Sequence, residues 1–176
     1  MAKKQSLKLL QERLAERLSA ARTESLAATW LAVEAGGHRY LLPLVQSGEI
    51  FPWSSVQRVP YTKDWYVGVA NLRGGLFGVI DLARLMGAGV AAAASDRVTS
   101  DARLVSLHAA LGVNAVLWVD RLLGLRSPGG FSAEAPPGPD SPLAVTRVLV
   151  DAQAQPWHEL DLQRLVSEPA FLAIAA

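Results

Sequence analysis

Cysteine is absent from the 176-residue chain. Without it the fold has no disulfide bond, no thiolate metal ligand and no cysteine nucleophile. An excess of charge is missing as well, because 17 Lys and Arg residues are balanced by 16 Asp and Glu residues, for a formal net charge of +1 at pH 7. Proteins that bind nucleic acid usually carry a strongly basic balance, so the composition gives no general argument for such a partner.

Long apolar runs are also missing. No stretch approaches the roughly 18 apolar residues that would span a bilayer. The first residues, MAKKQSLKLLQERL, carry charges throughout and contain no apolar core of signal-peptide length. We therefore expect a cytoplasmic protein with no direct membrane insertion. Hydrophobic residues make up 51% of the chain and charged residues 19%, which indicates one well-filled core or two small cores that share an interface.

A catalytic constellation is not found in the sequence. Its three histidines are scattered among a hairpin, a strand and a terminal segment: His38, His108 and His158. The residue four positions after His158 is Leu162, so the spacing of zinc proteases fails, and NLRGG lacks the Gly-Lys-Ser/Thr ending of a phosphate loop. Asp81 and Asp161 could form a carboxylate pair, but helix capping explains both. The sequence predicts no enzyme, no metal site and no cofactor.

What the sequence does contain begins with an amphipathic prefix, residues 1–25. Leucines recur there at three- and four-residue spacing, which predicts a helix over residues 3–22, on the positions Leu7, Leu10, Leu14 and Leu18. A lone helix of this length is marginal in water, so we expect it to pack on its own body or on a neighbouring protein. Its basic residues leave an anionic membrane surface as the alternative, although the apolar face lacks the bulky aromatics that interfacial helices favour.

The body, residues 26–176, has the pattern of many short strands. TWLAVEAGGHRYLLPL predicts a hairpin with its turn at Gly36-Gly37, and YVGVANL with GLFGVIDL predicts a second around Arg73. Further strand pairs are expected in ARLVSLHAAL with NAVLWVDRLLGL, and in LAVTRVLVDAQAQPWHELDL. Small residues over about 87–101 indicate a mobile connector, and SPGGFSAEAPPGPDSP indicates a long loop. This pattern favours an all-β sandwich or small barrels.

A short motif occurs twice, as IDLARL at residues 80–85 and as LDLQRL at residues 160–165. Each copy follows a predicted strand. In each, the aspartate is placed to cap a short helical turn whose leucines cover the open end of a barrel. The matching positions predict two similar β-barrels in one unit, and their ends, at Asp81, Leu82 and Asp161, are candidate partner-binding surfaces.

The stretch GVANLRGGLFGVIDL, residues 68–82, resembles the central signature of the CheW family of chemotaxis adaptors. That signature is a Gly-Val-x-Asn-Leu-Arg-Gly turn followed by a strand that ends in Val-x-Asp-Leu. VLWVDRLLGL, residues 116–125, resembles a later strand of the family, and the likeness extends over roughly residues 29–165. With DWYVGVAN and a helical prefix on a short chain, the sequence is most similar to the PilI-type adaptors of type IV pilus twitching motility.

The resemblance implies a mainly-β fold, in which two five-stranded SH3- or OB-like barrels share an apolar seam next to the N-terminal helix. It also implies a non-enzymatic adaptor without a cofactor. Such adaptors couple the cytoplasmic tips of methyl-accepting chemoreceptors to the regulatory domain of a CheA-type histidine kinase, within receptor arrays at the inner membrane. The barrel ends would then meet the kinase.

The resemblance further implies that a glutamate on an earlier strand, here Glu49, holds the turn arginine, Arg73. A guanidinium offers a planar donor fork, which could satisfy the carboxylate and exposed turn carbonyls together. We expect Gly68, Gly74 and Gly75 to adopt positive φ angles or to allow close approach of the backbone. The predicted receptor groove consists of Glu49, Gly68, Asn71, Arg73 and Gly74.

An OB-like barrel that binds single-stranded nucleic acid remains the alternative function. Such a site needs aromatic side chains within a basic groove. Four aromatic residues do gather before the Arg73 turn: Trp53, Tyr61, Trp65 and Tyr66. Only Arg58 and Lys63 accompany them, and Asp64 partly cancels this charge, so we interpret the cluster as packing of a crossover segment against the barrel.

Overall fold

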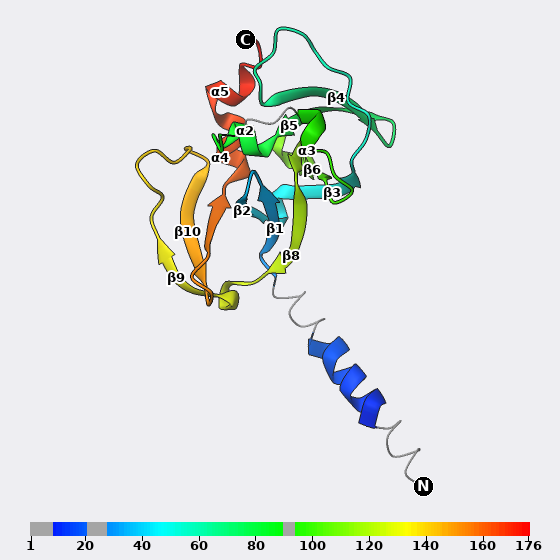
Figure 1. The fold of residues 1–176 in the computed structure, drawn as a ribbon, viewed down its shortest axis with the longest axis vertical. Helices are drawn as coiled ribbons and strands as arrows, with labels where there is room; N and C mark the ends of the chain where they lie inside the picture. Colours follow the sequence, from blue (N-terminus) through cyan, green and yellow to red (C-terminus); the bar gives the residue numbers. More distant parts are fainter. Residues whose placement is uncertain (1–8, 21–27, 90–93) are drawn as a thin grey trace.

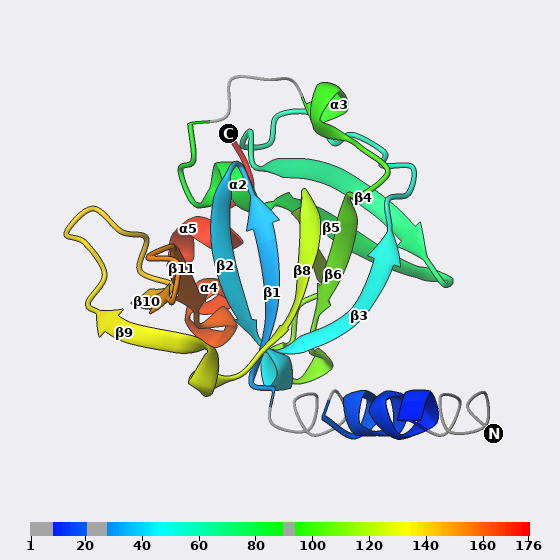
Figure 2. The same ribbon diagram turned by 60° about the horizontal axis from the view of Figure 1, so that its bottom comes forward.

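The computed structural model describes residues 9–20, 28–89 and 94–176. Residues 9–20 form the N-terminal helix, which projects away from the body in both views (Figures 1 and 2). Its leucines are exposed, with Leu10, Leu14 and Leu18 between 60% and 67% accessible. The structure therefore confirms a helix here but does not show it packed on its own body; the rest of the 1–25 prefix, Leu7 included, lies outside the described residues. Among the described helices, none has the length and apolar character needed to cross a membrane.

The described body contains eleven strands in two sheets. The six-stranded sheet has the order β8-β1-β2-β11-β10-β9, with β1 (Trp30–Ala35), β2 (His38–Pro43), β8 (Arg121–Arg126), β9 (Phe131–Ala135), β10 (Val145–Asp151) and β11 (Pro156–Leu160). The five-stranded sheet has the order β3-β6-β7-β5-β4, with β3 (Ser47–Pro52), β4 (Tyr66–Leu72), β5 (Gly75–Asp81), β6 (Arg103–Leu107) and β7 (Ala115–Val119).

Short helices and 3-10 turns join these strands. The α-helices are α2 (Leu82–Leu85), α3 (Ala94–Arg97), α4 (Leu162–Ser167) and α5 (Pro169–Leu172), and the 3-10 turns are η1 (Leu44–Gln46), η2 (Ala109–Leu111) and η3 (Pro128–Gly130). The mainly-β prediction with two subdomains is confirmed. In detail the sheets are open rather than closed barrels, and one of them has six strands instead of five.

The sixth strand, β9, lies in the segment that we predicted to be a loop. Residues 131–135 pair antiparallel with β10, with Ala135 opposite Val148 and Ala133 opposite Val150. Most of β9 is exposed, so its own residues supply little apolar signal. Its place in the sheet depends on hydrogen bonds to β10, which a reading of local pattern does not detect.

The two sheets are not successive halves of the chain. The hairpin β1–β2 precedes the five-stranded sheet, yet it joins β8 on one side and β11 on the other. The join to β11 is parallel, with His158 opposite Tyr40 and Glu159 opposite Leu41. Strands from both ends of the body thus complete one sheet, and Figure 2 shows β2, β1 and β8 side by side.

The core explains why several strands are apolar along their whole length. In β7 every residue is buried: Ala115, Leu117 and Val119 join a cluster that both sheets share, whereas Val116 and Trp118 join a second cluster on the other side of the five-stranded sheet. Strand β1 divides similarly between the shared cluster and a third cluster on the six-stranded sheet. The shared cluster is the predicted apolar seam, and it is confirmed.

Candidate functional site

The β4–β5 hairpin turns at Arg73 and Gly74, which have φ angles of +49° and +79°. Positive φ at both central residues is the mark of a type I′ turn, the usual connection of a two-residue hairpin. The side-chain oxygen of Asn71 accepts a hydrogen bond from the Gly74 N–H at 3.0 Å. Arg73 therefore adopts a backbone conformation that we had expected of the glycines alone. Gly75 is not in this region; a Cβ there would lie 2.9 Å from the Phe77 ring.

Arg73 forms the expected ion pair with Glu49, with Nη1 2.6 Å from Oε1. Glu49 lies on β3 and Arg73 follows β4, and these are the two outer strands of the five-stranded sheet. The pair therefore bridges the open side of that sheet. The two side chains are 76% and 42% exposed, so water screens their attraction and the pair contributes less than about 1 kcal/mol to stability.

Gly68, a predicted groove residue, lies five positions before Arg73, and its lack of a side chain allows another segment to approach β4. The crossover segment, residues 53–65, runs over β4 here, where Gln57 and Val69 exchange two backbone hydrogen bonds of 2.8 and 2.9 Å. A Cβ on Gly68 would lie 2.2 Å from the carbonyl oxygen of Gln57. Only glycine admits the crossover at this distance.

Asp81 caps α2, as predicted, by accepting a hydrogen bond from the Arg84 N–H. The residue is 0% exposed, and its other oxygen lies 2.6 Å from Arg97 Nη1. The second nitrogen of Arg97 lies 2.8 Å from Asp120 Oδ1. Asp120 in turn accepts a hydrogen bond of 2.7 Å from the Gly36 N–H. We call the trio of Asp81, Arg97 and Asp120 the Arg97 junction, because it links the ends of both sheets.

The Arg97 junction corrects our view of the 87–101 connector. Residues 90–93 lie outside the described residues, but α3 follows them and the side chain of Arg97 is only 10% exposed. Its guanidinium also lies 4.6 Å from the Trp118 ring centroid, in cation–π range. The end of the connector is therefore fixed in place. The only sequence signal was one arginine after a run of small residues.

Asp161 caps α4 by accepting hydrogen bonds from the backbone N–H groups of Gln163 and Arg164. Gln46 extends this cap, because its side chain donates to Asp161 at 3.2 Å and accepts from the Leu162 N–H at 2.7 Å. The capping prediction is thus confirmed at both motifs. Their leucines, Leu82 and Leu162, do not cover two separate ends, since both are 0% exposed and enter the shared cluster.

The aromatic residues of the crossover mostly pack inward. Trp53 contacts Trp118 with ring centroids 4.8 Å apart, and Trp65 stacks on Phe171 at 5.9 Å. Tyr61 is the exception, with 89% exposure. Packing of the crossover against the body therefore accounts for both tryptophans, which leaves them unavailable as a stacking surface for bases.

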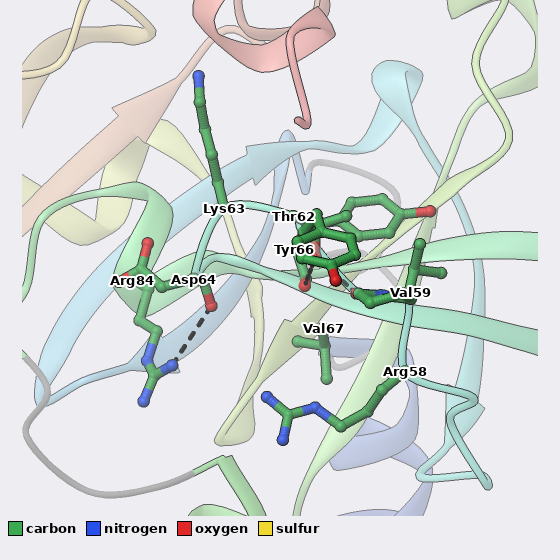
Figure 3. A pocket seen from close by; sticks show the side chains of 10 residues that line it. Arg58, Val59, Thr62, Lys63, Asp64, Tyr66, Val67 and Arg84 are labelled. Atoms are coloured by element: carbon green, nitrogen blue, oxygen red, sulfur yellow. Dashed lines mark hydrogen bonds between the residues drawn. The ribbon is translucent and has the colours of Figure 1, made fainter. Parts of the chain in front are cut away.

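A cavity of about 530 Å³ lies beside this crossover (Figure 3). Its lining combines both signs of charge, with Arg58 and Lys63 next to Asp64, whose carbonyl accepts a hydrogen bond from Arg84 at 3.3 Å. The C-terminal tail closes over the same segment, since the Ala176 N–H donates to the Tyr61 carbonyl. Figure 1 shows the C-terminus next to this crossover.

Two open sheets around one shared core, with capped helices after β5 and β11 and a charged hairpin turn, define a domain of the CheW type. A model of the CheW-like domain matches residues 29–170, and the chain belongs to this family. The chain is 28% identical to Protein PilI of Pseudomonas aeruginosa over 165 residues, which cover 93% of this chain and 89% of PilI.

A solved structure supports the fold assignment. The crystal structure of the scaffolding protein TtCheW from Thermoanaerobacter tengcongensis superposes with a TM-score of 0.65 and 21% identity, and it covers 84% of this chain and 97% of TtCheW. The fold is therefore that of a CheW scaffold.

Proposed function

We propose that this chain is a non-enzymatic adaptor that couples methyl-accepting chemoreceptors to a CheA-type histidine kinase in the control of type IV pili. The observation that carries the proposal is the CheW-like match over residues 29–170, which accounts for nearly the whole body. The similarity to PilI supports a pathway that controls pili. The adaptor would act in the cytoplasm, held at the inner membrane through the receptors it binds.

The receptor tip would bind at the Arg73 turn. Glu49, Asn71 and Arg73 are exposed there, and two apolar side chains near them are 39% and 63% exposed: Ile50 on β3, and Leu76 on β5, opposite Asn71. An ion pair flanked by exposed apolar groups suits a partner surface, because the apolar groups lose contact with water on binding while the charges select the partner. Gly68 and Gly74 would contribute only indirectly, Gly68 by allowing the crossover to pack on β4 and Gly74 by forming the hairpin turn.

The kinase regulatory domain would bind at the ends of the sheets near α2 and α4. Asp81 and Leu82 are fully buried, so their part would be to hold the helices, while exposed neighbours such as Gln163 and Arg164 would meet the kinase. Contacts in signalling assemblies are often modest in area, and a micromolar dissociation constant corresponds to about −8 kcal/mol.

Reconstitution of adaptor, kinase and a receptor cytoplasmic fragment tests the proposal. We expect the adaptor to bind the kinase and the receptor fragment separately, each at roughly micromolar strength. Kinase autophosphorylation should rise only when all three are present. Calorimetry that detects no binding to either partner at tens of micromolar would contradict the proposal, whatever the fold.

Replacement of Arg73 by alanine separates the two roles of the turn. Because the pair with Glu49 is exposed, the free energy of unfolding should fall by less than about 1 kcal/mol. Receptor binding should weaken by more than this, since the charge is lost at the centre of the proposed contact. A double-mutant cycle with Glu49→Ala, measured by urea unfolding and by receptor-fragment binding, should show coupling in both readouts. Additive effects on receptor binding would show that the pair does not act as a unit.

A further inference from the structure

Two of the three histidines, far apart in the sequence, lie together on the six-stranded sheet. His158 of β11 is opposite Tyr40 of β2, and His38 lies two residues before Tyr40, so the three side chains share one face of the sheet. The ring centroids of His38 and His158 are 6.1 Å apart. Both line a cavity of about 500 Å³, which Asp140 also borders.

The hydrogen bonds of the two rings fix the same tautomer in both. Nδ1 of His38 lies 3.1 Å from the Gly36 carbonyl oxygen, and Nδ1 of His158 lies 3.3 Å from that of Arg39. A carbonyl oxygen can only accept, so each Nδ1 must carry the hydrogen. In the neutral rings the lone pair is therefore on Nε2, and an Nδ1–H bonded to a backbone carbonyl is the usual outer contact of a histidine that binds a metal.

We propose that His38 and His158 together bind a divalent transition-metal ion such as Zn²⁺ or Ni²⁺ through their Nε2 atoms, with water completing the coordination. With Zn–N bonds of about 2.0–2.1 Å, two imidazoles on one tetrahedral ion have ring centroids roughly 5 Å apart. The observed 6.1 Å therefore requires the two rings to move together by about 1 Å when the ion binds. Imidazole nitrogen is a favoured ligand of zinc, copper and nickel. The same cavity is lined by Met86, Gly87, Ala88 and Gly89, which directly follow α2, so this site borders the kinase surface proposed above.

The remainder of the site determines how tightly it can hold the ion. Within the described residues no group of three or more His, Cys, Asp or Glu side chains is arranged to bind a metal, so the protein supplies two ligands. The affinity should accordingly be that of an open, exchangeable site and not of a structural zinc centre. Since the chain contains no cysteine, no thiolate competes for the ion.

His108 provides a matched control within the same chain. Its Nδ1 accepts a hydrogen bond of 3.1 Å from the Ala110 N–H, so the hydrogen of the neutral ring is on Nε2. This ring offers no free lone pair to a metal. His108→Ala removes one imidazole, as the other two substitutions do, without touching the pair.

The experiment is a calorimetric titration of the untagged full chain with ZnCl₂ at pH 7.5. We expect one ion per chain for the wild type, an affinity at least about tenfold weaker for His38→Ala and for His158→Ala, and an unchanged affinity for His108→Ala. Imidazole ¹⁵N NMR spectra should show Zn²⁺-dependent shifts at Nε2 of His38 and His158 alone, and far-ultraviolet circular dichroism should show that each variant is folded. Three outcomes would overturn the proposal. The wild type does not bind Zn²⁺, all three variants lose affinity equally, or the His38→Ala and His158→Ala variants keep the wild-type affinity.

Discussion

Replacement of Arg97 by alanine should lower the free energy of unfolding by about 3 kcal/mol. Arg97 pairs with Asp81, which is 0% exposed, and loss of one partner leaves a buried carboxylate without its counter-charge. Asp81 keeps the Arg84 N–H bond and the Arg84 guanidinium at 3.6 Å, so the loss should lie at the low end of the range for buried pairs. Equilibrium unfolding in urea measures this change.

Arg121→Ala is the matched control for this experiment. Arg121 also pairs with a carboxylate, Glu34, at 2.9 Å, but its side chain is 53% exposed, so its loss should cost less than about 1 kcal/mol. Arg97→Met adds a second comparison, because it keeps apolar contact with Trp118 while removing the charge. If Arg97→Ala lowers the free energy of unfolding no more than Arg121→Ala does, the buried carboxylate of Asp81 does not need Arg97 as its counter-charge.

The sequence predicts well those parts of the fold that depend on neighbouring residues. The turns at Gly36-Gly37 and at Arg73, and the caps at Asp81 and Asp161, are all present in the structure. Each depends on residues within a few positions of one another, where turn and cap chemistry is specific. By contrast, β9 and the parallel pairing of β2 with β11 depend on partners distant in the chain, and local pattern carries no record of them.

The candidate site divides in the same way. The cap role of Asp81 follows from its own motif, but its ion pair with Arg97 forms only when the connector folds back onto the sheet ends. The pair of Glu49 and Arg73 was expected from the family resemblance, since nothing in the local pattern links β3 to the β4–β5 turn. The two histidines His38 and His158 look unrelated in the sequence. They become neighbours only through the parallel pairing of β2 with β11, which the local pattern does not reveal.

Replacement of Gly68 by alanine should also destabilise the protein by about 3 kcal/mol, because overpacking and backbone strain add. The new Cβ would lie 2.2 Å from the Gln57 carbonyl oxygen and 3.0 Å from Arg58 Cα. Both are backbone atoms, which cannot rotate away as a flexible side chain can. Gly68 also has φ of +149°, a conformation that residues with a side chain rarely adopt. The crossover should therefore move off β4, which urea unfolding and near-ultraviolet circular dichroism of its tryptophans would detect.

Gly74→Ala is the control that separates two causes of the destabilisation expected for Gly68→Ala, the steric clash of the new Cβ and the strain of a positive φ angle. Gly74 has φ of +79°, yet a Cβ there would meet nothing within 4 Å, so the cost should be the conformational strain alone, about 1 kcal/mol. The tryptophan signals should stay unchanged in this variant, since no atom of the crossover lies within 4 Å of the new Cβ. Equal losses at the two positions, with the crossover signals intact in both, would show that the contact between Gly68 and Gln57 does not fix the crossover. A larger loss at Gly68, together with changed tryptophan signals, would show that the close contact with Gln57 holds the crossover against β4.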